Sequence, residues 1–326
     1  MPRKYIRRFL DDRFGNPWDR FLRRARQRNS RRLLIFWNRG LGDIALGLYQ
    51  IIVELRQCVP HAEIVVLTRA DLADCFQLLP VDRVVIDPAL KREEGSSTLR
   101  AKHHVQASRN AYDLVLTRID PTRWFRQKPK CQPRLAWPEH LDGLCARFDG
   151  QFEAVGPGEL CIGIHVSSET ATFYKYEKDW PTECWRALII QIGALRPCRF
   201  ILFGLASSTG LDMANCIDLR GQTSLLEMLA LIKNRCRILI APDSGVLTMT
   251  YYLDVQVALG VVSLWSDPRQ GVLKQGTASP NALLRHLALI GDSEEVARIA
   301  VGDVVAAVES LLGTETTSIS CSVDDD

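Results

Sequence analysis

The chain has 326 residues, of which 47% are hydrophobic and 24% charged, and its formal net charge is +3. At roughly 100–200 residues per domain, this predicts a globular protein of two domains. No apolar run reaches the roughly 18 residues that span a bilayer, and no signal peptide is recognisable, so we expect a cytoplasmic protein. The ten cysteines form no CxxC pair and show no metal-type spacing with histidine, which predicts reduced thiols and no metal site.

The first 32 residues form a basic arm. They hold twelve Lys and Arg against three Asp, a local charge of +9, so the remaining chain carries −6. Apolar residues recur at helical spacing among the arginines, in two stripes: Ile6, Phe9, Leu10 and Phe14, then Trp18, Phe21 and Leu22. Two interpretations fit: a helix on the surface of an anionic membrane, or a helical extension docked on the body with its arginines in water. Nucleic-acid binding is disfavoured, because the body is acidic and shows no recognised nucleic-acid module.

Residues 33–150 alternate between short apolar runs and helical patterns. Such alternation predicts βα units and a parallel, doubly wound sheet. In chain order we expect strand Leu33–Trp37, helix Asp43–Arg56, strand Glu63–Thr68, helix Leu72–Leu79, strand Arg83–Ile86 and strand Asp113–Thr117, with loop or irregular chain over Lys91–Arg109 and Pro121–Pro138.

The weakly hydrophobic stretch Asp149–Glu159 marks the boundary to a second domain over residues 151–313. There we expect, in chain order, strand Leu160–Val166, helix Pro181–Leu195, strand Phe200–Gly204, helix Ser224–Asn234, strand Arg237–Ile240, helix Gly245–Leu253, strand Val255–Leu259 and helix Ser293–Leu312. The polar tail over 314–326 is predicted to be disordered. Two similar α/β domains facing a cleft are the expected architecture.

A glycine turn follows the first strand. Gly40, Gly42 and Asp43 stand in a stretch that formally matches the dinucleotide fingerprint, and Arg69 follows the second strand, where it could bind a 2′-phosphate. An NADP-linked oxidoreductase is therefore one alternative. The carboxylate of Asp43 disfavours it, because an acidic side chain repels a pyrophosphate. A purely structural turn, with Asp43 favouring the helix dipole, is another alternative.

Polar residues also follow the strands of the second domain. The carboxyl ends of parallel strands share one edge of a sheet, where α/β folds bind ligands, and junctions between a strand and a helix bind anions. For Trp180 and Trp185 core packing is favoured over a pocket wall. The candidate anion contacts at this edge are the side chains of Ser167, Ser168, Lys175 and Lys178 and the backbone amides of Ser244 and Gly245. Asp243 could accept a hydrogen bond from a ligand hydroxyl or cap its helix.

Taken in order, these motifs resemble the family 9 glycosyltransferases, the ADP-heptose:lipopolysaccharide heptosyltransferases and their relatives, over about residues 33–312. The matching motifs are Gly42-Asp43, the K-x-W-P-x-E-x-W segment Lys178–Trp185, the G-x-T-S-L-x-E segment Gly221–Glu227 and the helix start Asp243–Gly245. The resemblance implies a GT-B fold with two Rossmann-like domains, the donor bound mainly by the second. It also implies inversion at the sugar carbon with no metal and no cofactor beyond the nucleotide-sugar.

By the same resemblance, Asp43 corresponds to the catalytic base, and Lys178 with Ser167 and Ser168 to contacts of the donor phosphate. Lys175 shares or replaces the role of Lys178. The remaining donor-binding positions are Glu227, Asp243, Ser244, Gly245 and Thr248, the last in place of the histidine that is usual in the family.

The implied reaction transfers a sugar, heptose from ADP-heptose in the first instance, to a glycan or lipid-linked acceptor such as a lipopolysaccharide core. A GT-B protein that binds without catalysis is the alternative. The basic arm, residues 1–32, would place the enzyme at the inner face of an anionic membrane.

Overall fold

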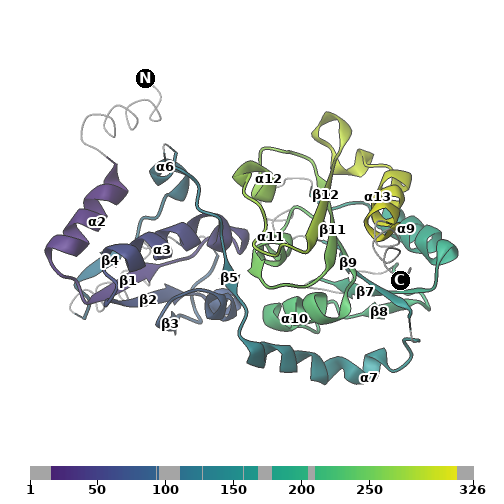
Figure 1. Cartoon of the computed structure of the whole chain (residues 1–326), viewed down its shortest axis with the longest axis horizontal. Helices are drawn as coiled ribbons and strands as arrows, with labels where there is room; N and C mark the ends of the chain where they lie inside the picture. Colours follow the sequence, from purple (N-terminus) through teal and green to yellow (C-terminus); the bar gives the residue numbers. More distant parts are fainter. Residues whose placement is uncertain are drawn as a thin grey trace, which may run out of the picture. The chain divides into compact units, whose positions relative to one another are not determined.

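The computed structural model describes residues 16–92, 94, 111–126, 128–156, 158–167, 178–204 and 210–313. The chain divides into two compact units, Met1–Ala136 and Trp137–Asp326 (Figure 1). This division falls before the boundary expected after residue 150, because the 3₁₀-helix η3 (Glu139–Phe148) packs on α10 (Leu225–Arg235) of the second unit. The contact includes Asp142 Oδ1, which accepts from Lys233 Nζ at 2.8 Å.

The first unit contains a four-stranded parallel sheet in the order β3-β2-β1-β4. Leu34 and Phe36 of β1 pack against Val65 and Leu67 of β2, with Leu90 beside them. The unit's elements are α2 (Pro17–Gln27), β1 (Arg32–Phe36), the π-helix η1 (Ile44–Leu48), α3 (Tyr49–Cys58), β2 (Glu63–Thr68), α4 (Ala70–Ala73), the 3₁₀-helix η2 (Asp74–Leu78), β3 (Arg83–Ile86), β4 (Leu114–Leu116), α6 (Pro121–Trp124) and β5 (Leu135–Ala136). The predicted parallel, doubly wound sheet is confirmed.

The second unit contains a six-stranded parallel sheet in the order β12-β11-β9-β6-β7-β8. Its further elements are α7 (Asp149–Phe152), β6 (Leu160–His165), α9 (Thr182–Leu195), β7 (Cys198–Phe203), β8 (Cys216–Asp218), β9 (Ile238–Pro242), α11 (Gly245–Tyr251), β10 (Leu253–Asp254), β11 (Leu259–Trp265), α12 (Gly271–Gln275), β12 (Leu284–Ile290), the 3₁₀-helices η4 (Asp292–Glu294) and η5 (Val296–Arg298), and α13 (Val301–Gly313). The predicted α/β class, with two parallel, doubly wound sheets, is confirmed.

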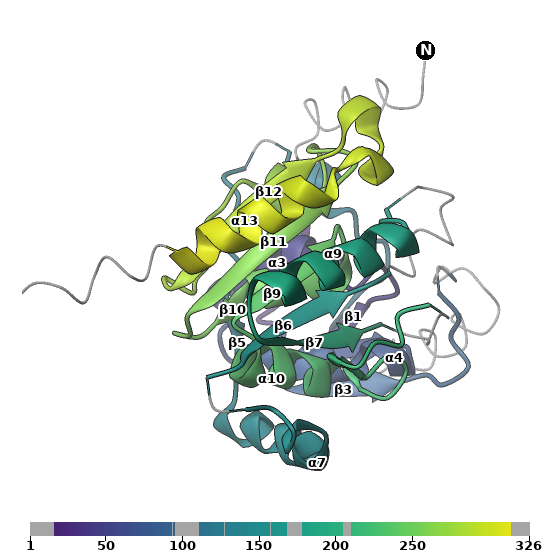
Figure 2. The ribbon, with the colours of Figure 1, turned by 90° about the vertical axis from the view of Figure 1, so that its right-hand side faces the viewer.

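Helices cover both faces of the six-stranded sheet. Figure 2 shows α9 and α13 over one face and α10 on the other. Trp185 of α9 is fully buried and lies edge-on to Trp180, with ring centroids 4.9 Å apart. Trp180 also donates its indole N–H to the Ile299 carbonyl at 3.1 Å. Both tryptophans therefore belong to the core, as the favoured interpretation held.

Strand order fixes where each sheet can bind a ligand. In the first unit the chain runs from β1 outward to β3 and then crosses to β4 on the opposite side of β1. In the second unit the same reversal separates β6 from β9. Ligands of open α/β sheets bind outside the carboxyl ends of the strands at such a reversal. The segments after β1 and β4, and after β6 and β9, are thus the places to look for a site.

Three predicted elements need correction. The strand expected at Val255–Leu259 is wrong: β11 only begins at Leu259, because the uninterrupted apolar run lies over 259–265. The helix expected over Ser293–Leu312 begins at Val301, since Ser293 and Glu294 have positive φ and break the helix. The connection Pro121–Pro138 is not wholly irregular, because Asp120 caps the short helix α6 through its side chain. The tail 314–326 lies outside the described residues.

The basic arm is docked on the first unit where it is described. Trp18 of α2 is fully buried and stacks on Trp124, with ring centroids 5.4 Å apart. Its indole N–H donates to Glu54 Oε2 at 2.6 Å, and Asp19 pairs with Lys128 at 2.6 Å. Over Pro17–Gln27 the docked extension is therefore confirmed, and the first apolar stripe, before residue 16, lies outside the described part of the chain.

None of the helices in the described ranges is long and apolar enough to cross a membrane.

Candidate active site

A buried ion pair lies at the strand reversal of the second sheet. Asp243 directly follows β9, and its Oδ2 accepts from Lys178 Nζ at 2.5 Å. Only 12% of the lysine side chain and 11% of the aspartate side chain are exposed. Removing one partner would leave a buried, uncompensated charge on the other, which is strongly destabilising. The two residues are 65 positions apart in sequence, and the parallel topology brings them together.

A glycine gives the carboxylate of Asp243 its space. Gly271 begins α12 with φ +50°, and a Cβ atom there would lie 2.8 Å from Asp243 Oδ1 and 2.6 Å from the Trp265 ring. Any other side chain at this position would displace the carboxylate or the tryptophan. The backbone amide of Asp243 donates to Leu264 O at 3.0 Å and fixes the end of β9.

The turn after Asp243 is a capped helix start. Ser244 is the N-cap of α11, and its Oγ accepts from the Leu247 amide at 3.1 Å. One turn later the Thr248 hydroxyl donates to Ser244 O at 3.0 Å, and Thr248 is buried. A hydroxyl has one proton to donate. The Thr248 proton is therefore used within the helix, and its hydroxyl oxygen can still accept a hydrogen bond.

Ser167 is exposed just beyond β6, at the other side of the same reversal. A Cβ placed on Gly204, after β7, would lie 3.8 Å from Ser167 Oγ and 3.6 Å from Arg220 Cγ. The ends of β6, β7 and β8 thus converge. Of the predicted donor contacts, Ser168 and Lys175 lie outside the described residues.

Arg220 is a cation that the sequence analysis did not single out. Its side chain is only 1% exposed, and it binds Asp218 twice, from Nε to Oδ1 at 2.8 Å and from Nη2 to Oδ2 at 2.6 Å. These hydrogen bonds lower the pKa of Asp218. The spacing Asp-x-Arg at a strand end was the available signal, because a planar guanidinium pairs with a carboxylate in this bidentate way.

Glu227 lies in the first turn of α10 and forms a capping box with the N-cap Ser224. Glu227 Oε2 accepts from the Ser224 amide at 2.7 Å, and Ser224 Oγ accepts from the Glu227 amide at 3.3 Å. Glu227 Oε1 accepts from Arg147 at 2.8 Å. Burial raises the pKa of Glu227, but the Ser224 and Arg147 hydrogen bonds outweigh it, so the pKa lies below the usual value.

Asp43 lies at the reversal of the first sheet, in the turn between β1 and η1. It precedes Ile44, its side chain makes no cap hydrogen bond, and its Oδ2 pairs instead with Arg39 Nε at 3.3 Å. About two fifths of both side chains are exposed. The carboxylate is thus accessible and is not a helix cap. The π-helix η1 that follows is a type of distortion frequent at functional sites.

The glycines of this turn are not in a left-handed conformation, since neither Gly40 nor Gly42 has positive φ. A Cβ on Gly40 would lie 3.6 Å from Asp43 Oδ2, an ordinary contact. The backbone conformation of this turn therefore does not by itself require glycine at either position. Gly47 has less room for a side chain than Gly40, because a Cβ at Gly47 would lie 2.8 Å from the Pro121 ring of α6.

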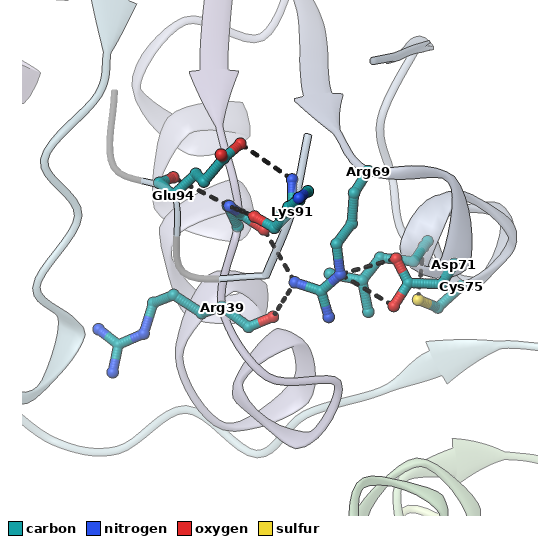
Figure 3. Close-up of polar contacts among 8 residues, drawn as sticks. Arg39, Arg69, Asp71, Cys75, Lys91 and Glu94 are labelled. Atoms are coloured by element: carbon teal, nitrogen blue, oxygen red, sulfur yellow. Dashed lines mark hydrogen bonds and ion pairs between the residues drawn. The ribbon is translucent and has the colours of Figure 1, made fainter. Parts of the chain in front are cut away.

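The guanidinium of Arg69 is hydrogen-bonded to neighbouring residues of the first unit (Figure 3). Its Nε donates to both oxygens of Asp71 at 2.7 and 2.8 Å, and its Nη1 donates to Asn38 Oδ1 at 2.8 Å and to Arg39 O at 3.2 Å. Only 6% of the side chain is exposed. These contacts leave Arg69 poorly placed to hold a 2′-phosphate, which weakens the NADP alternative.

Within the described ranges, no three His, Cys, Asp or Glu side chains lie close enough together to hold a metal ion.

The protein therefore belongs to the α/β class with two parallel, doubly wound sheets. Charged and hydroxyl residues lie beyond the carboxyl ends of the strands. No family model matches the sequence, and no curated protein matches it. Comparison with solved structures shows which α/β fold the chain has.

The chain is similar to a family 9 glycosyltransferase from Veillonella parvula, with 17% identity, a TM-score of 0.61 and coverage of 88% of this chain and 99% of that one. It is also similar to ADP-heptose lps heptosyltransferase II of E. coli, with 17% identity, a TM-score of 0.60 and coverage of 88% and 100%. The E. coli heptosyltransferase WaaC with ADP gives 14% identity, a TM-score of 0.52 and coverage of 86% and 99%. At these identities the likeness shows that the chain has the fold of these glycosyltransferases.

Proposed function

We propose that the protein is an inverting glycosyltransferase that takes its sugar from a nucleoside diphosphate sugar. The observation that carries this proposal is the Lys178–Asp243 pair, a lysine held at the strand reversal of the second sheet. A diphosphate leaving group needs a cation beside it, and a sugar needs a carboxylate or hydroxyl to orient its own hydroxyls. This pair supplies both groups in one place.

In the proposed mechanism, Asp43 accepts the proton of an acceptor hydroxyl while that oxygen attacks the anomeric carbon. The bond from this carbon to the diphosphate breaks, and Lys178 with Ser167 stabilises the charge on the departing phosphate. The amides of Ser244 and Gly245, and the predicted contacts Ser168 and Lys175, would add to this stabilisation.

ADP-heptose is the donor we favour, and a lipopolysaccharide-type glycan the acceptor. Support comes from the fold shared with enzymes described as heptosyltransferases, one of them with ADP bound. Because Thr248 stands where the family usually has histidine, the identity of the donor sugar needs its own test. A direct test incubates the protein with ADP-, UDP- and GDP-sugars and a glycan acceptor, and follows release of the nucleoside diphosphate.

Two alternatives predict different results in that assay. A non-catalytic GT-B protein would bind one of these nucleotides without releasing it. An NADP-linked oxidoreductase would bind NADP instead. The hydrogen bonds from Arg69 to Asp71 and Asn38 disfavour this alternative, because they occupy the cation that would hold the 2′-phosphate. Metal independence is part of the proposal, and release that survives EDTA would support it.

We also propose that α2 holds the enzyme at an anionic membrane surface from the cytoplasmic side. Arg23, Arg24 and Arg26 of α2 are exposed, and within the described part of the chain none of them is paired with a carboxylate. Trp18 is used to dock the helix, so insertion of this tryptophan is not part of the proposal. Attraction between arginine and anionic headgroups remains, at about 1 kcal/mol per residue near the surface.

We expect replacement of Arg23, Arg24 and Arg26 by Gln to weaken binding to vesicles containing phosphatidylglycerol on the order of a hundredfold, since about 3 kcal/mol is lost. Co-sedimentation at low and raised salt measures this. The matched control replaces the same three arginines by Lys, which keeps the charge and should keep binding. Equal binding by the Gln and Lys variants would mean that these arginines are merely solvated surface.

A further inference from the structure

A buried arginine ties together three strand ends beside the proposed base. Arg69 follows β2, and a guanidinium so well buried is costly unless its N–H groups are paired. It is paired with Asp71 on its own turn, and with Asn38 and the Arg39 carbonyl on the turn after β1. The guanidinium thus joins the segment after β2 to the segment that carries Asp43.

Asn38 extends the connection to a third segment. It is buried, and its Nδ2 donates to the carbonyls of Lys91 and Glu94 at 2.7 and 2.9 Å, both in the chain after β3. Its Oδ1 receives the Arg69 bond, so the amide is used at both ends. Figure 3 shows Arg69 between Asp71 on one side and Arg39 on the other, with Lys91 and Glu94 nearby.

Arg39 connects this cluster to Asp43. Its carbonyl is held by Arg69, while its Nε pairs with Asp43 Oδ2 and its Nη1 reaches Ile119 O, after β4, at 3.5 Å. Arg39 therefore touches both sides of the strand reversal. A continuous series of contacts runs from the Arg69 guanidinium through the backbone and side chain of Arg39 to the carboxylate of Asp43.

We propose that Arg69 is a positioning residue that holds the Arg39–Asp43 turn in the geometry needed for proton acceptance, an inference that rests on the proposed role of Asp43. Arg69 does not touch substrate in this account. Displacement of a reacting group by about 1 Å can cost on the order of a hundredfold in rate, so a residue acting through a backbone carbonyl can matter as much as a direct contact. Lysine cannot replace it, because an ammonium has no planar fork to serve Asp71, Asn38 and Arg39 together.

The same sheet offers a matched control at its opposite edge. Arg56 of α3 donates to Pro80 O at 3.0 Å, to Ala62 O at 2.8 Å and to Asp82 Oδ2 at 2.5 Å. It too ties separate segments with one guanidinium, but at the amino ends of β2 and β3. Losing it should affect stability in a similar way without affecting Asp43.

The experiment compares Arg69→Lys with Arg56→Lys in the full chain. Thermal unfolding corrects for the folded fraction, and steady-state assays at saturating donor give kcat and the KM of each substrate. We expect Arg69→Lys to lower kcat ten- to hundredfold with donor KM unchanged, and Arg56→Lys to leave both within about twofold. Hydrogen exchange of the amides of residues 38–43 should be faster in Arg69→Lys only.

The outcomes separate this inference from the proposed function. Equal kcat losses in the two variants, or unchanged exchange over 38–43 in Arg69→Lys, would reduce Arg69 to a structural residue. If the unmodified protein transfers no sugar, the proposed function fails while the exchange measurement still decides whether Arg69 holds the turn. If Arg69→Lys does not fold, Asp71→Asn is tested in its place. This variant weakens the contact of the same guanidinium with one exposed partner.

Discussion

Replacing Asp43 by Asn should lower sugar transfer by a factor of about 10² to 10⁴, the usual contribution of general base catalysis, while donor affinity stays within about twofold. The amide keeps the shape of the carboxylate but cannot accept the proton of the acceptor hydroxyl. Because Asp43 makes no helix-cap hydrogen bond, the variant should keep its thermal stability. Product formation and donor binding are measured on the same preparation.

Arg39→Gln is the matched control for this variant. Both substitutions break the same ion pair, which spans 3.3 Å, but only Asp43→Asn removes a proton acceptor. We expect the Arg39 variant to lose about tenfold in kcat through misplacement of the carboxylate. Equal losses in the two variants would assign the effect to the ion pair, and full turnover in Asp43→Asn would exclude Asp43 as the base.

Replacing Lys178 by Met should weaken binding of the nucleoside diphosphate ten- to hundredfold or more, and binding of the free nucleoside far less. A charge-assisted hydrogen bond is worth about 1.5–3 kcal/mol, which sets the lower end of this scale. The structure adds a second loss, because the Met variant leaves the buried carboxylate of Asp243 unpaired where a diphosphate would bind. The variant should therefore also be less stable than the unmodified protein.

The double variant Lys178→Met, Asp243→Asn separates these two losses. It removes the unpaired charge, so we expect thermal stability to recover while diphosphate affinity stays low. Calorimetric titration with the diphosphate and the nucleoside measures both affinities. If the single variant weakens the two ligands equally, Lys178 does not contact phosphate. If Lys175→Ala alone gives the loss, the contact belongs to that lysine.

Local sequence patterns predicted most of the first sheet. Strands β2 and β3 begin and end at the predicted residues, because short apolar runs there are bounded by polar or turn residues. Strand β12 was missed, since it forms the edge of the second sheet and shows neither a continuous buried run nor a regular alternation over 284–290. The helix α2 was visible as an apolar stripe, but its partner Trp124 lies more than a hundred residues away and could not be inferred.

In the candidate site, too, features formed by residues close in sequence could be predicted, whereas contacts between distant residues could not. The Ser224–Glu227 capping box depends on residues three apart, a spacing that can be read from the sequence alone. The shared sheet edge of Lys178 and Asp243 followed from the order of strands, whereas their direct contact needed the folded chain. The pairing of Glu227 with Arg147, across 80 positions, had no local signal.

Equilibrium binding of nucleotides to the unmodified protein and to its Lys178→Met and Asp43→Asn variants tests the central claim most directly. Thermal unfolding is recorded with ADP-, UDP- and GDP-sugars and with NADP, since a ligand at a hundred times its Kd stabilises the folded state by about 2.7 kcal/mol. We predict that a nucleoside diphosphate sugar raises the Tm of the unmodified protein and of Asp43→Asn, but not of Lys178→Met. Stabilisation by NADP alone, or a diphosphate-sugar effect that survives in Lys178→Met and disappears in Asp43→Asn, would contradict the assignment.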